Sequence, residues 1–464
     1  MKGNAIKMLA QLLANYAISL DYSTIPGLAI QQAKRSILDA LGVAIAGSLS
    51  HIGKSIVSYV SVMGGPLEST VITTQLKCPA PNAALAIGTM GHALDYDDES
   101  ISLAGHPTVT ILPAALTLGE KTKASGKEIL TAFITGLEIA CKIGKVVNPD
   151  HFNKGFHPTS TLGVFGATIA AAKILRLSSD EVANAIGIAG SMSSGLQENF
   201  GSFTKPLHAG LASQNGVVST LLAKGGITSS RSIFEGDQGF FKAFVDKKIE
   251  PIKILERLGN PFELVDQEII YKLYPTCSRT QAAISGILDL MKRHRFSKDL
   301  IDVVDCGTDE KALDILIFHK PKTIDQCRFS MEFCIALAIL NRGVRLCDFC
   351  EKQLNDPKVL EMMNKIKMSV DPEIVSLGYN KRSAVSITVK LIDGKEYRNV
   401  NFAKGFAENP ISDNDIIGKY RDCAGPLLEK ENLERSIELI LNLEKVDDVS
   451  QLTQLLVSNS DILK

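Results

Sequence analysis

Nearly uncharged stretches rich in Gly and Ala run through the first half of the chain and limit what it can fold into. Leu162–Leu175 (LGVFGATIAAAKIL) carries apolar or small residues at almost every position, including Gly163 and Gly166. A helix of this composition has no polar face for water, so it is expected to have neighbours on all sides. Small side chains let those neighbours approach closely. The sequence therefore predicts a large, tightly packed helical domain.

Further helical signals continue over about the first 245 residues. Leu28–Gly47 places apolar residues on one face after Pro26-Gly27, a typical helix start. Two Ser-x-x-Glu sequences, beginning at Ser125 and Ser178, predict capping boxes. At the beginning of the chain, polar residues interrupt a short apolar run, which predicts an amphipathic first helix rather than a signal peptide.

The pattern changes after about residue 265, where short alternating segments predict strands. These segments are Asp302–Gly307, Met368–Val370 and a hairpin of Ala384–Leu391 and Lys395–Phe402 around Asp393-Gly394. Glu431–Leu456 is again expected to be helical. The fold class is therefore predicted as mainly α, with a large helical domain, an α+β insert and a closing helical segment.

The composition excludes several classes of function. The chain has 50 Lys+Arg against 51 Asp+Glu, whereas nucleic-acid binders concentrate basic charge. With 6% aromatic residues and no Trp, it also lacks a platform for stacking bases. Its nine Cys are scattered, as in a reducing compartment. No run is apolar enough to predict a membrane span, so a soluble, cytoplasmic protein is expected.

Common catalytic motifs are absent. The chain has no phosphate-binding GxxxxGK[ST] or GxGxxG sequence, no GxSxG elbow and no HExxH zinc motif. Cys277, Cys347 and Cys350 could together hold an iron–sulfur cluster, but the CxxC pair lies in a charged segment without a Gly-Pro cradle. Structural cysteines are the favoured interpretation, and neither a metal site nor a cofactor is predicted.

Polar clusters within the apolar half are the candidates for a site. Asp95, Asp97, Asp98 and Glu99 place four acids in five positions between small-residue helices. Buried carboxylates are costly unless they have partners or a function, although a solvated loop is the alternative. Lys205 is the one Lys in a nearly uncharged stretch, so it could anchor a carboxylate, donate a proton or simply cap a helix.

The triplet His-Pro-Thr occurs twice, at His106 and at His157, each time before a small-residue apolar stretch. A residue before Pro avoids helical geometry and Pro favours the first helical position, so each His is expected near a helix N-terminus. The helix dipole there lowers the pKa of an imidazole and favours bound anions. A neutral imidazole beside a carboxylate can act as a base for C–H abstraction. Either His alone could equally be structural.

Together these clusters resemble the MmgE/PrpD family, in order and spacing, over nearly the whole chain. The matching segments are His92–Asp98, Gly105–Thr108, Leu112–Ala115, His157–Ala167, Thr204–Gly210 and Tyr274–Cys277. Members of this family include 2-methylcitrate dehydratases, cis-aconitate decarboxylases and iminodisuccinate epimerases. The resemblance implies a helical domain built from both chain ends, residues 1–265 plus 405–464, with a smaller α+β lid domain at 266–404. It also implies a homodimer and chemistry on small polycarboxylates without metal or organic cofactor.

Carried over residue by residue, the resemblance implies a set of site residues. The expected catalytic residues are Asp95, His106, His157 and Lys205. The expected substrate-binding residues are Glu99, Thr204, His208, Tyr274, Cys277 and Gln281. The chain departs from the decarboxylases at Cys277, where they carry His, and at Glu99, where they carry Thr. Many other members have His at the position of Gln281.

The leading hypothesis is a cofactor-independent hydro-lyase acting on a 2-methylcitrate-like polycarboxylate. One of the two His-Pro-Thr histidines would remove a proton, and the other, or Asp95, would protonate a leaving hydroxyl. Lys205 and helix N-terminal amides would stabilise the developing charge. The alternatives are an epimerase of a dicarboxylate such as iminodisuccinate, a cis-aconitate decarboxylase-like enzyme, and a non-catalytic organic-acid binder.

Overall fold

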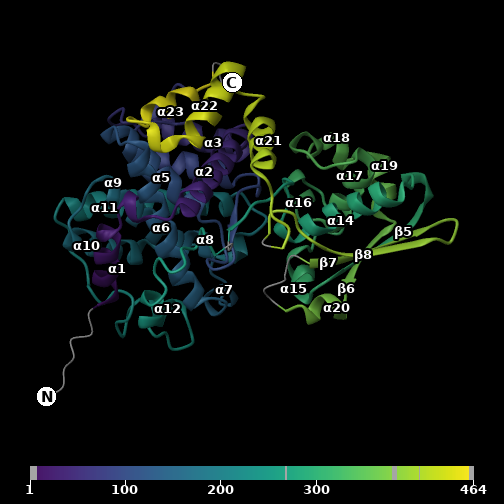
Figure 1. Ribbon diagram of the computed structural model, residues 1–464, viewed down its shortest axis with the longest axis horizontal. Coiled ribbons are helices and arrows are strands. Elements are labelled where there is room, and N and C mark those ends of the chain that lie inside the picture. The colour runs from purple at the N-terminus through teal and green to yellow at the C-terminus, as the bar shows by residue number, and fades with distance from the viewer. Residues whose placement is uncertain (1–7, 267–268, 379–383, 407, 459–464) are drawn as a thin grey trace. The chain divides into compact units, whose positions relative to one another are not determined.

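The computed structural model in Figure 1 describes residues 8–266, 269–378, 384–406 and 408–458. It is mainly α-helical, as the sequence predicts, with few and mostly short strands. The chain divides into two compact units. The first comprises the residues up to Ala93, Asp97–Ile269 and the residues from Asp413 on, and the second comprises Leu94–Tyr96 and Ile270–Ser412. The expected domain boundaries and the lid role remain predictions.

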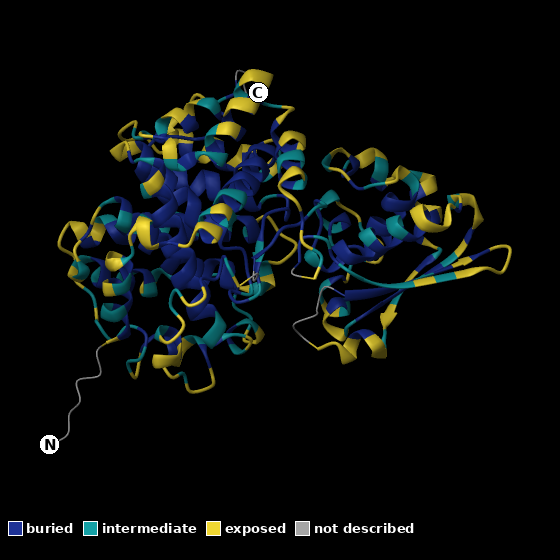
Figure 2. Ribbon diagram, viewed as in Figure 1, coloured by how far each residue is buried: buried dark blue, intermediate teal, exposed yellow. Residues whose placement is uncertain are grey.

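The first unit is built almost entirely of helices. They are α1 (Leu9–Ser19), α2 (Gly27–Gly47), α3 (His51–Val62), α4 (Ala80–His92), α5 (Thr108–Thr122), α6 (Gly126–Val147), α7 (Asp150–Asn153), α8 (Pro158–Thr161), α9 (Gly163–Ile174), α10 (Ser179–Met192), α11 (Thr204–Lys224), α12 (Phe240–Phe244), α13 (Ile252–Leu255), α21 (Asp413–Ala424), α22 (Lys430–Leu441) and α23 (Ser450–Leu455). Strands β1 (Ser69–Thr70) and β2 (Lys77–Cys78) pair antiparallel, and β3 is Glu99–Ser100. Helix α11 packs against α4 and α9, and α9 also packs against α5 and α6. Figure 2 shows these central helices as the buried core of the unit.

Glycines set the distance between the central helices. A Cβ atom added to Gly210 in α11 would lie 2.3 Å from the carbonyl oxygen of Leu85 in α4. A Cβ on Gly136 in α6 would lie 2.4 Å from the carbonyl oxygen of Gly166 in α9. Backbone therefore meets backbone at both crossings, which confirms the close packing expected from the small residues.

Local signals in the sequence are largely confirmed in the first unit. Both capping boxes form, with Ser125 and Ser178 each accepting from the amide three residues later and bonded in return by that Glu. The expected helix over Glu431–Leu456 is wrong in one respect, because it breaks after Leu441. The carbonyl of Val446 accepts from the amide of Gly126 at 2.8 Å, so a contact with the start of α6 overrides the helical propensity of this segment.

The second unit contains the sheet and a smaller set of helices. The helices are α14 (Ser278–His294), α15 (Glu310–Ile315), α16 (Ile324–Cys327), α17 (Met331–Asn341), α18 (Glu351–Leu354), α19 (Pro357–Met363) and α20 (Pro372–Ser376). The strands are β5 (Ile301–Thr308), β6 (Ile366–Val370), β7 (Ala384–Leu391) and β8 (Glu396–Phe402), in the order β6-β5-β7-β8. Strands β5 and β6 are parallel, whereas β5–β7 and β7–β8 are antiparallel. The hairpin predicted around Asp393-Gly394 is therefore confirmed, and α14 packs against both of its strands. Strand β4 (Ile269–Ile270) stands where the chain passes from the first unit to the second.

Within the described ranges, no single helix is long and apolar enough to cross a membrane. Helices α2 and α3 together reach the necessary length and composition, but they are bent by 86° relative to each other. Most of α2 is buried in the helical core of the first unit.

The close contact of Gly210 with α4 predicts that two Gly→Ala substitutions in helices differ in their effect on stability. Gly210→Ala forces a methyl group against the backbone of α4, so we expect a loss of about 1–3 kcal/mol in stability. Gly418→Ala in α21 meets no atom within 4 Å and should stabilise the helix by up to about 1 kcal/mol. Thermal and denaturant unfolding of both variants measures the difference. Equal stability of the two variants would show that α4 and α11 are not in backbone contact.

Candidate active site

Four buried histidines gather in the first unit from four separate segments. His92 is the last residue of α4, His106 precedes Pro107 at the start of α5, His157 is the N-cap of α8, and His208 lies in the first turns of α11. The rings of His92 and His106 are 4.5 Å apart between centroids, those of His92 and His157 are 5.8 Å apart, and those of His157 and His208 are 5.3 Å apart. The sequence predicted His106, His157 and His208, whereas His92 was not among the expected site residues.

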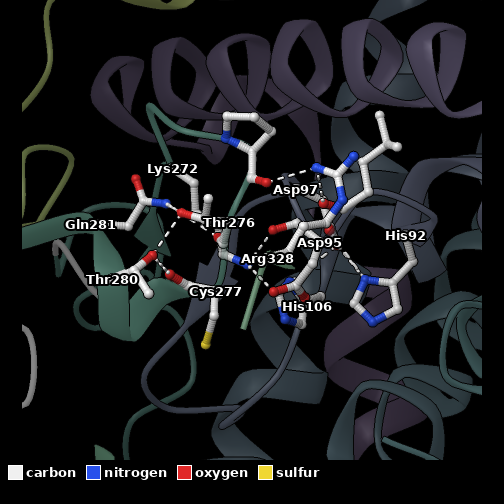
Figure 3. Close-up of polar contacts among 12 residues, drawn as sticks. His92, Asp95, Asp97, His106, Lys272, Thr276, Cys277, Thr280, Gln281 and Arg328 are labelled. Carbon is white, nitrogen blue, oxygen red and sulfur yellow. Dashed lines mark hydrogen bonds and ion pairs between the residues drawn. The ribbon is translucent and has the colours of Figure 1, made fainter. Parts of the chain in front are cut away.

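Asp97 joins two of these histidines. Its Oδ2 lies 2.9 Å from Nδ1 of His92 and 3.1 Å from Nδ1 of His106 (Figure 3). Although burial alone would raise the pKa of Asp97, the imidazoles of His106 and His92 hold it well below its usual range. Asp97 is therefore a buried anion between two imidazole donors. In the sequence it belongs to the candidate acidic cluster, but no catalytic or binding role was predicted for it.

The orientation of the His106 ring follows from its neighbours. Its Nδ1 lies 2.7 Å from the carbonyl oxygen of Asp98, so Nδ1 carries a proton and, in the neutral ring, Nε2 carries the lone pair. The backbone amide of His106 donates to Oγ1 of Thr159 at 3.1 Å. This hydrogen bond ties one His-Pro-Thr segment to the other. The two repeated triplets therefore meet in space, as their shared sequence context indicated.

His92, the last residue of α4, has one ring nitrogen without a hydrogen-bond partner among the described residues. Because Nδ1 of His92 faces the carboxylate of Asp97, Nδ1 is the donor and Nε2 is the acceptor. No residue in the described part of the chain bonds to Nε2 of His92, which is fully buried. Burial, with Lys205 and His106 nearby, lowers the pKa of His92 to about 4 despite the opposing effect of Asp97. A buried acceptor of this kind is unusual unless a ligand group satisfies it.

His157 and His208 contact each other directly. Their Nδ1 atoms are 3.1 Å apart, so one ring donates a proton that the other accepts, and at least one of the two must be neutral. Burial, followed by the influence of His92 and Lys205, holds the pKa of His157 well below its usual value. Burial and Lys205 also lower the pKa of His208. Both imidazoles are therefore neutral at physiological pH.

Lys205 brings the positive charge of this cluster. It lies in the first turn of α11, three residues before His208 and thus on the same side of the helix. Its Nζ lies 5.5 Å from the ring centroid of Phe200, which also packs edge-on against His157. The side chain is buried, and Thr204 immediately before it begins α11. Lys205 is thus close enough to His157 and His208 to lower the pKa of both, whereas a shared catalytic role stays a prediction.

Besides Asp97, two further acids of the predicted cluster, Asp98 and Glu99, lie in the first unit. Oδ2 of Asp98 accepts from Oγ1 of Thr108 at 2.5 Å, and burial together with the charge of Asp39 raises the pKa of Asp98 to about 7. Its Oδ1 has no hydrogen-bond partner among the described residues. Glu99 lies in β3 and is half-buried. Asp98 therefore exchanges a proton close to neutral pH, whereas Asp97 stays ionised.

The other predicted residues belong to the second unit and form their own group there. Asp95 has a left-handed backbone with φ of 51°, and its carboxylate lies 3.2 Å from Nζ of Lys272. The same Nζ donates to the carbonyl oxygen of Asp95 at 2.6 Å. Lys272 is almost fully buried and was not predicted. Asp95 is therefore an ion-paired carboxylate in a strained turn.

The side chain of Gln281 holds the turn that follows Lys272, and Cys277 lies at the end of this turn. The Gln281 side chain accepts from the amides of Leu273 and Tyr274 and donates to the carbonyls of Tyr274 and Thr276. These bonds occupy its amide with the backbone of the turn. Cys277 is the N-cap of α14 and is buried. Substrate binding by Tyr274, Cys277 and Gln281 stays a prediction.

Arg328 is a further buried cation of the second unit that the sequence analysis missed. It donates to the carbonyl oxygen of Pro275 at 2.7 Å, and its guanidinium group lies 4.6 Å from the ring centroid of Phe349. Its Nε has no hydrogen-bond partner among the described residues. Arg328 stands in a segment with ordinary charge, so no local sequence pattern distinguishes it.

His92, Asp97 and His106 also have the spacing of a metal-ligand group, with ligand atoms within 4.8 Å of one another. However, Nδ1 of His106 points at the carbonyl of Asp98 and so carries a proton instead of offering a lone pair. The contacts thus describe a hydrogen-bonded network around Asp97. Within the described ranges, the cysteines of the candidate iron–sulfur site form no comparable group, and Cys347 is exposed.

Comparisons with known proteins agree over almost the whole chain. The family model for the MmgE/PrpD N-terminal domain matches residues 11–252, and that for the MmgE/PrpD C-terminal domain matches residues 274–445. The cis-aconitate decarboxylase of Homo sapiens is 27% identical over 470 residues, which cover 97% of this chain and 95% of the relative. That of Mus musculus is 28% identical over 449 residues, covering 92% and 89%. That of Aspergillus terreus is 25% identical over 477 residues, covering 98% and 96%.

The low pKa of His92 predicts a specific acid sensitivity. Between pH 6.5 and about 4, His92 is protonated in the unfolded chain but stays neutral in the folded chain. The free energy of unfolding therefore falls as the pH falls through this window. The expected contribution is up to about 1.4 kcal/mol per pH unit. His92→Asn keeps a donor toward Asp97 but cannot titrate, so its free energy of unfolding should decline less steeply. Denaturant unfolding between pH 7 and pH 4.5 measures this slope.

The matched control for this experiment is His51→Asn, which changes an exposed histidine of the same unit. Its pH dependence should follow that of the wild type. A wild-type slope in His92→Asn would mean that His92 titrates normally and is not held neutral by the site.

Proposed function

We propose that this chain, which belongs to the MmgE/PrpD family, is a lyase that acts on a small polycarboxylate by acid–base chemistry next to a carboxylate group. The observation that carries the proposal is the neutral, hydrogen-bonded pair of His157 and His208 beside the buried Lys205. The names of the relatives support a lyase and a polycarboxylate substrate, because they are cis-aconitate decarboxylases matched along nearly their full length.

Neutral imidazoles near a buried cation suit the removal of a proton from carbon. A hydrogen on the carbon next to a carboxylate is only weakly acidic, and its removal places negative charge on the carboxylate oxygens. Lys205 would stabilise that charge, while the imidazole of His157, with His208 behind it, would take the proton. This assignment uses His157 and Lys205 in the roles that the sequence analysis expected.

His106 and Asp97 form a complementary pair for returning a proton. Asp97 would stabilise the imidazolium form of His106, just as a buried carboxylate does for the histidine of a serine protease. The Nε2 of that imidazolium could then protonate a departing hydroxyl. In this hydro-lyase step the C–H and C–O bonds break, an alkene forms, and the hydroxide leaves as water. The 2-methylcitrate-like dehydration therefore remains our first candidate reaction.

Decarboxylation is the second candidate, and the named relatives favour it. In that reaction a C–C bond breaks, carbon dioxide leaves, and a donor protonates the remaining carbanion. It needs one proton donor and no base. The site instead offers the neutral pair of His157 and His208 in addition to the His106–Asp97 pair, which is why we place dehydration first.

Incubation with candidate acids in heavy water, followed by proton and carbon NMR, separates the reactions. Dehydration of 2-methylcitrate should give an alkene, and decarboxylation of cis-aconitate that carries a ¹³C label in its carboxyl groups should release labelled carbon dioxide. Epimerisation of a dicarboxylate should exchange the α-proton for deuterium without loss of any group. We expect the alkene, with His157→Ala as the inactive control. Binding of these acids without turnover by any route would favour an organic-acid binder and would contradict the proposal.

The contact between His157 and His208 predicts that the two residues act as one unit. His157→Ala and His208→Ala should each lower kcat by about 10²-fold or more, and the double variant should lose little beyond the larger single effect. Lys224→Gln, at the exposed far end of the same helix, is the control and should retain wild-type rates. Steady-state rates on the acid that turns over give the four values of the cycle. Independent multiplication of the two single effects would show that the histidines serve different steps.

A further inference from the structure

A cavity of the first unit is lined by different residues from those of the histidine cluster and carries mainly positive charge. Its volume is about 500 Å³, and it lies between the end of α6 and the segment 247–257. None of the four clustered histidines lines it. Its cationic lining residues are Lys142, Lys145, Lys247, Lys248, Lys253 and Arg257. Only two carboxylates, Glu250 and Glu256, line the same cavity.

The excess of cations is local, because the whole chain carries nearly equal numbers of the two signs. Some of these cations are paired, since Lys253 lies 3.2 Å from Glu250 and Lys145 lies 3.2 Å from Asp266. Neither Lys248 nor Arg257 has an ion-pair partner among the described residues. A bound anion would supply the counter-charge that the described residues do not give these two side chains.

The walls of the cavity are fixed by buried hydrogen bonds. Lys142 lies 2.7 Å from Oε1 of Glu263 and donates to the carbonyl oxygen of Pro261 at 2.9 Å. Glu138, one turn earlier in α6, accepts from the amides of Gly259 at 2.8 Å and Glu263 at 2.7 Å. These bonds hold the segment after α13 against α6. The backbone that carries this part of the basic lining is therefore held in place by hydrogen bonds.

The beginning of the segment 247–257 is fixed in a similar way. Lys247 donates from Nζ to the carbonyl oxygen of Asn148 at 3.1 Å, directly after α6. A carboxylate oxygen of Asp150 accepts from the amides of Asp246 and Lys247 at 2.6 and 3.2 Å. The backbone just before Lys248 is thus held in place, so an anion bound there would not have to order this part of the chain.

We propose that this basic cavity is an accessory binding site for a small anion that carries two or more negative charges. Its volume is within the range of about 300–1,000 Å³ that is typical of small-molecule sites. Lysines bind phosphate and carboxylate groups as mobile point charges, and Arg257 can bind either group through two hydrogen bonds. Phosphate and carboxylate anions share this chemistry, so both are probes of the site.

Isothermal titration calorimetry of the full chain at low ionic strength tests this proposal with inorganic pyrophosphate, citrate and acetate. The test variant is Lys248→Gln/Arg257→Gln, which removes two exposed charges without breaking an ion pair. The control is Lys54→Gln/Lys224→Gln, which removes two exposed charges elsewhere in the same unit. Lys205→Met reports on the candidate active site, and titrations of citrate are carried out in that background so that the two sites are not confused.

Pyrophosphate or citrate should bind, acetate should bind much more weakly, and added salt should weaken all binding. In Lys248→Gln/Arg257→Gln the affinity should fall by about tenfold or more, while the control and Lys205→Met should bind pyrophosphate like the wild type. Binding of pyrophosphate alone identifies a phosphate site, and binding of citrate alone identifies a carboxylate site. Three results would overturn the proposal: unchanged affinity in the test variant, loss of pyrophosphate binding in Lys205→Met, or no binding of either probe at millimolar concentration.

Discussion

The buried charge of Asp97 is the constraint on which the site depends. A carboxylate removed from water among apolar helices is tolerated only if donors replace its hydration. Two imidazole Nδ1 atoms provide these donors, from His92 at the end of α4 and from His106 before α5. The position of Asp97 thus fixes both rings, their tautomers and the direction in which each Nε2 carries its lone pair. Most of the chemistry proposed above follows from this one arrangement.

Close helix packing brings the remaining groups to this anion. Helix α11 crosses α4 where Gly210 meets Leu85, so the first turn of α11, with Lys205 and His208, approaches the end of α4 with His92. A Cβ on Gly105 would lie 2.7 Å from the amide nitrogen of Thr159, which shows how closely the two His-Pro-Thr segments approach. Larger side chains at these positions would separate the histidines that the mechanism needs together.

The sequence predicts the parts of this arrangement that have a local signature. The capping boxes, the hairpin around Asp393-Gly394 and the place of His157 at a helix N-terminus follow from short-range rules, and the structure agrees with them. His92 has no local signature of this kind, and although the family resemblance includes the segment His92–Asp98, it assigned His92 no role. Its role depends on a contact with Asp97 that only the fold creates.

For Gln281, the family resemblance and the structure give different information. The resemblance placed Gln281 among the substrate-binding residues, whereas its amide bonds to the backbone of Leu273, Tyr274 and Thr276. Family matching identifies positions, but it does not report whether the polar atoms at a position are already engaged. The end of α22 at Leu441 was also missed, because it depends on a contact between Val446 and Gly126, which are far apart in the sequence.

The low pKa values of the histidine cluster have a consequence for the proposed reaction. Desolvation and the charge of Lys205 keep His92 and His157 neutral, and a neutral imidazole with a very low pKa is a weak base. A polycarboxylate entering the site would bring two or three negative charges close to these rings. Such charges favour the imidazolium form, so they raise the pKa of each imidazole toward the range where it can accept and return a proton at neutral pH. The substrate would therefore raise the pKa values on which its own reaction depends. The chain alone keeps the imidazoles neutral and weakly basic, and the bound anion makes them stronger bases.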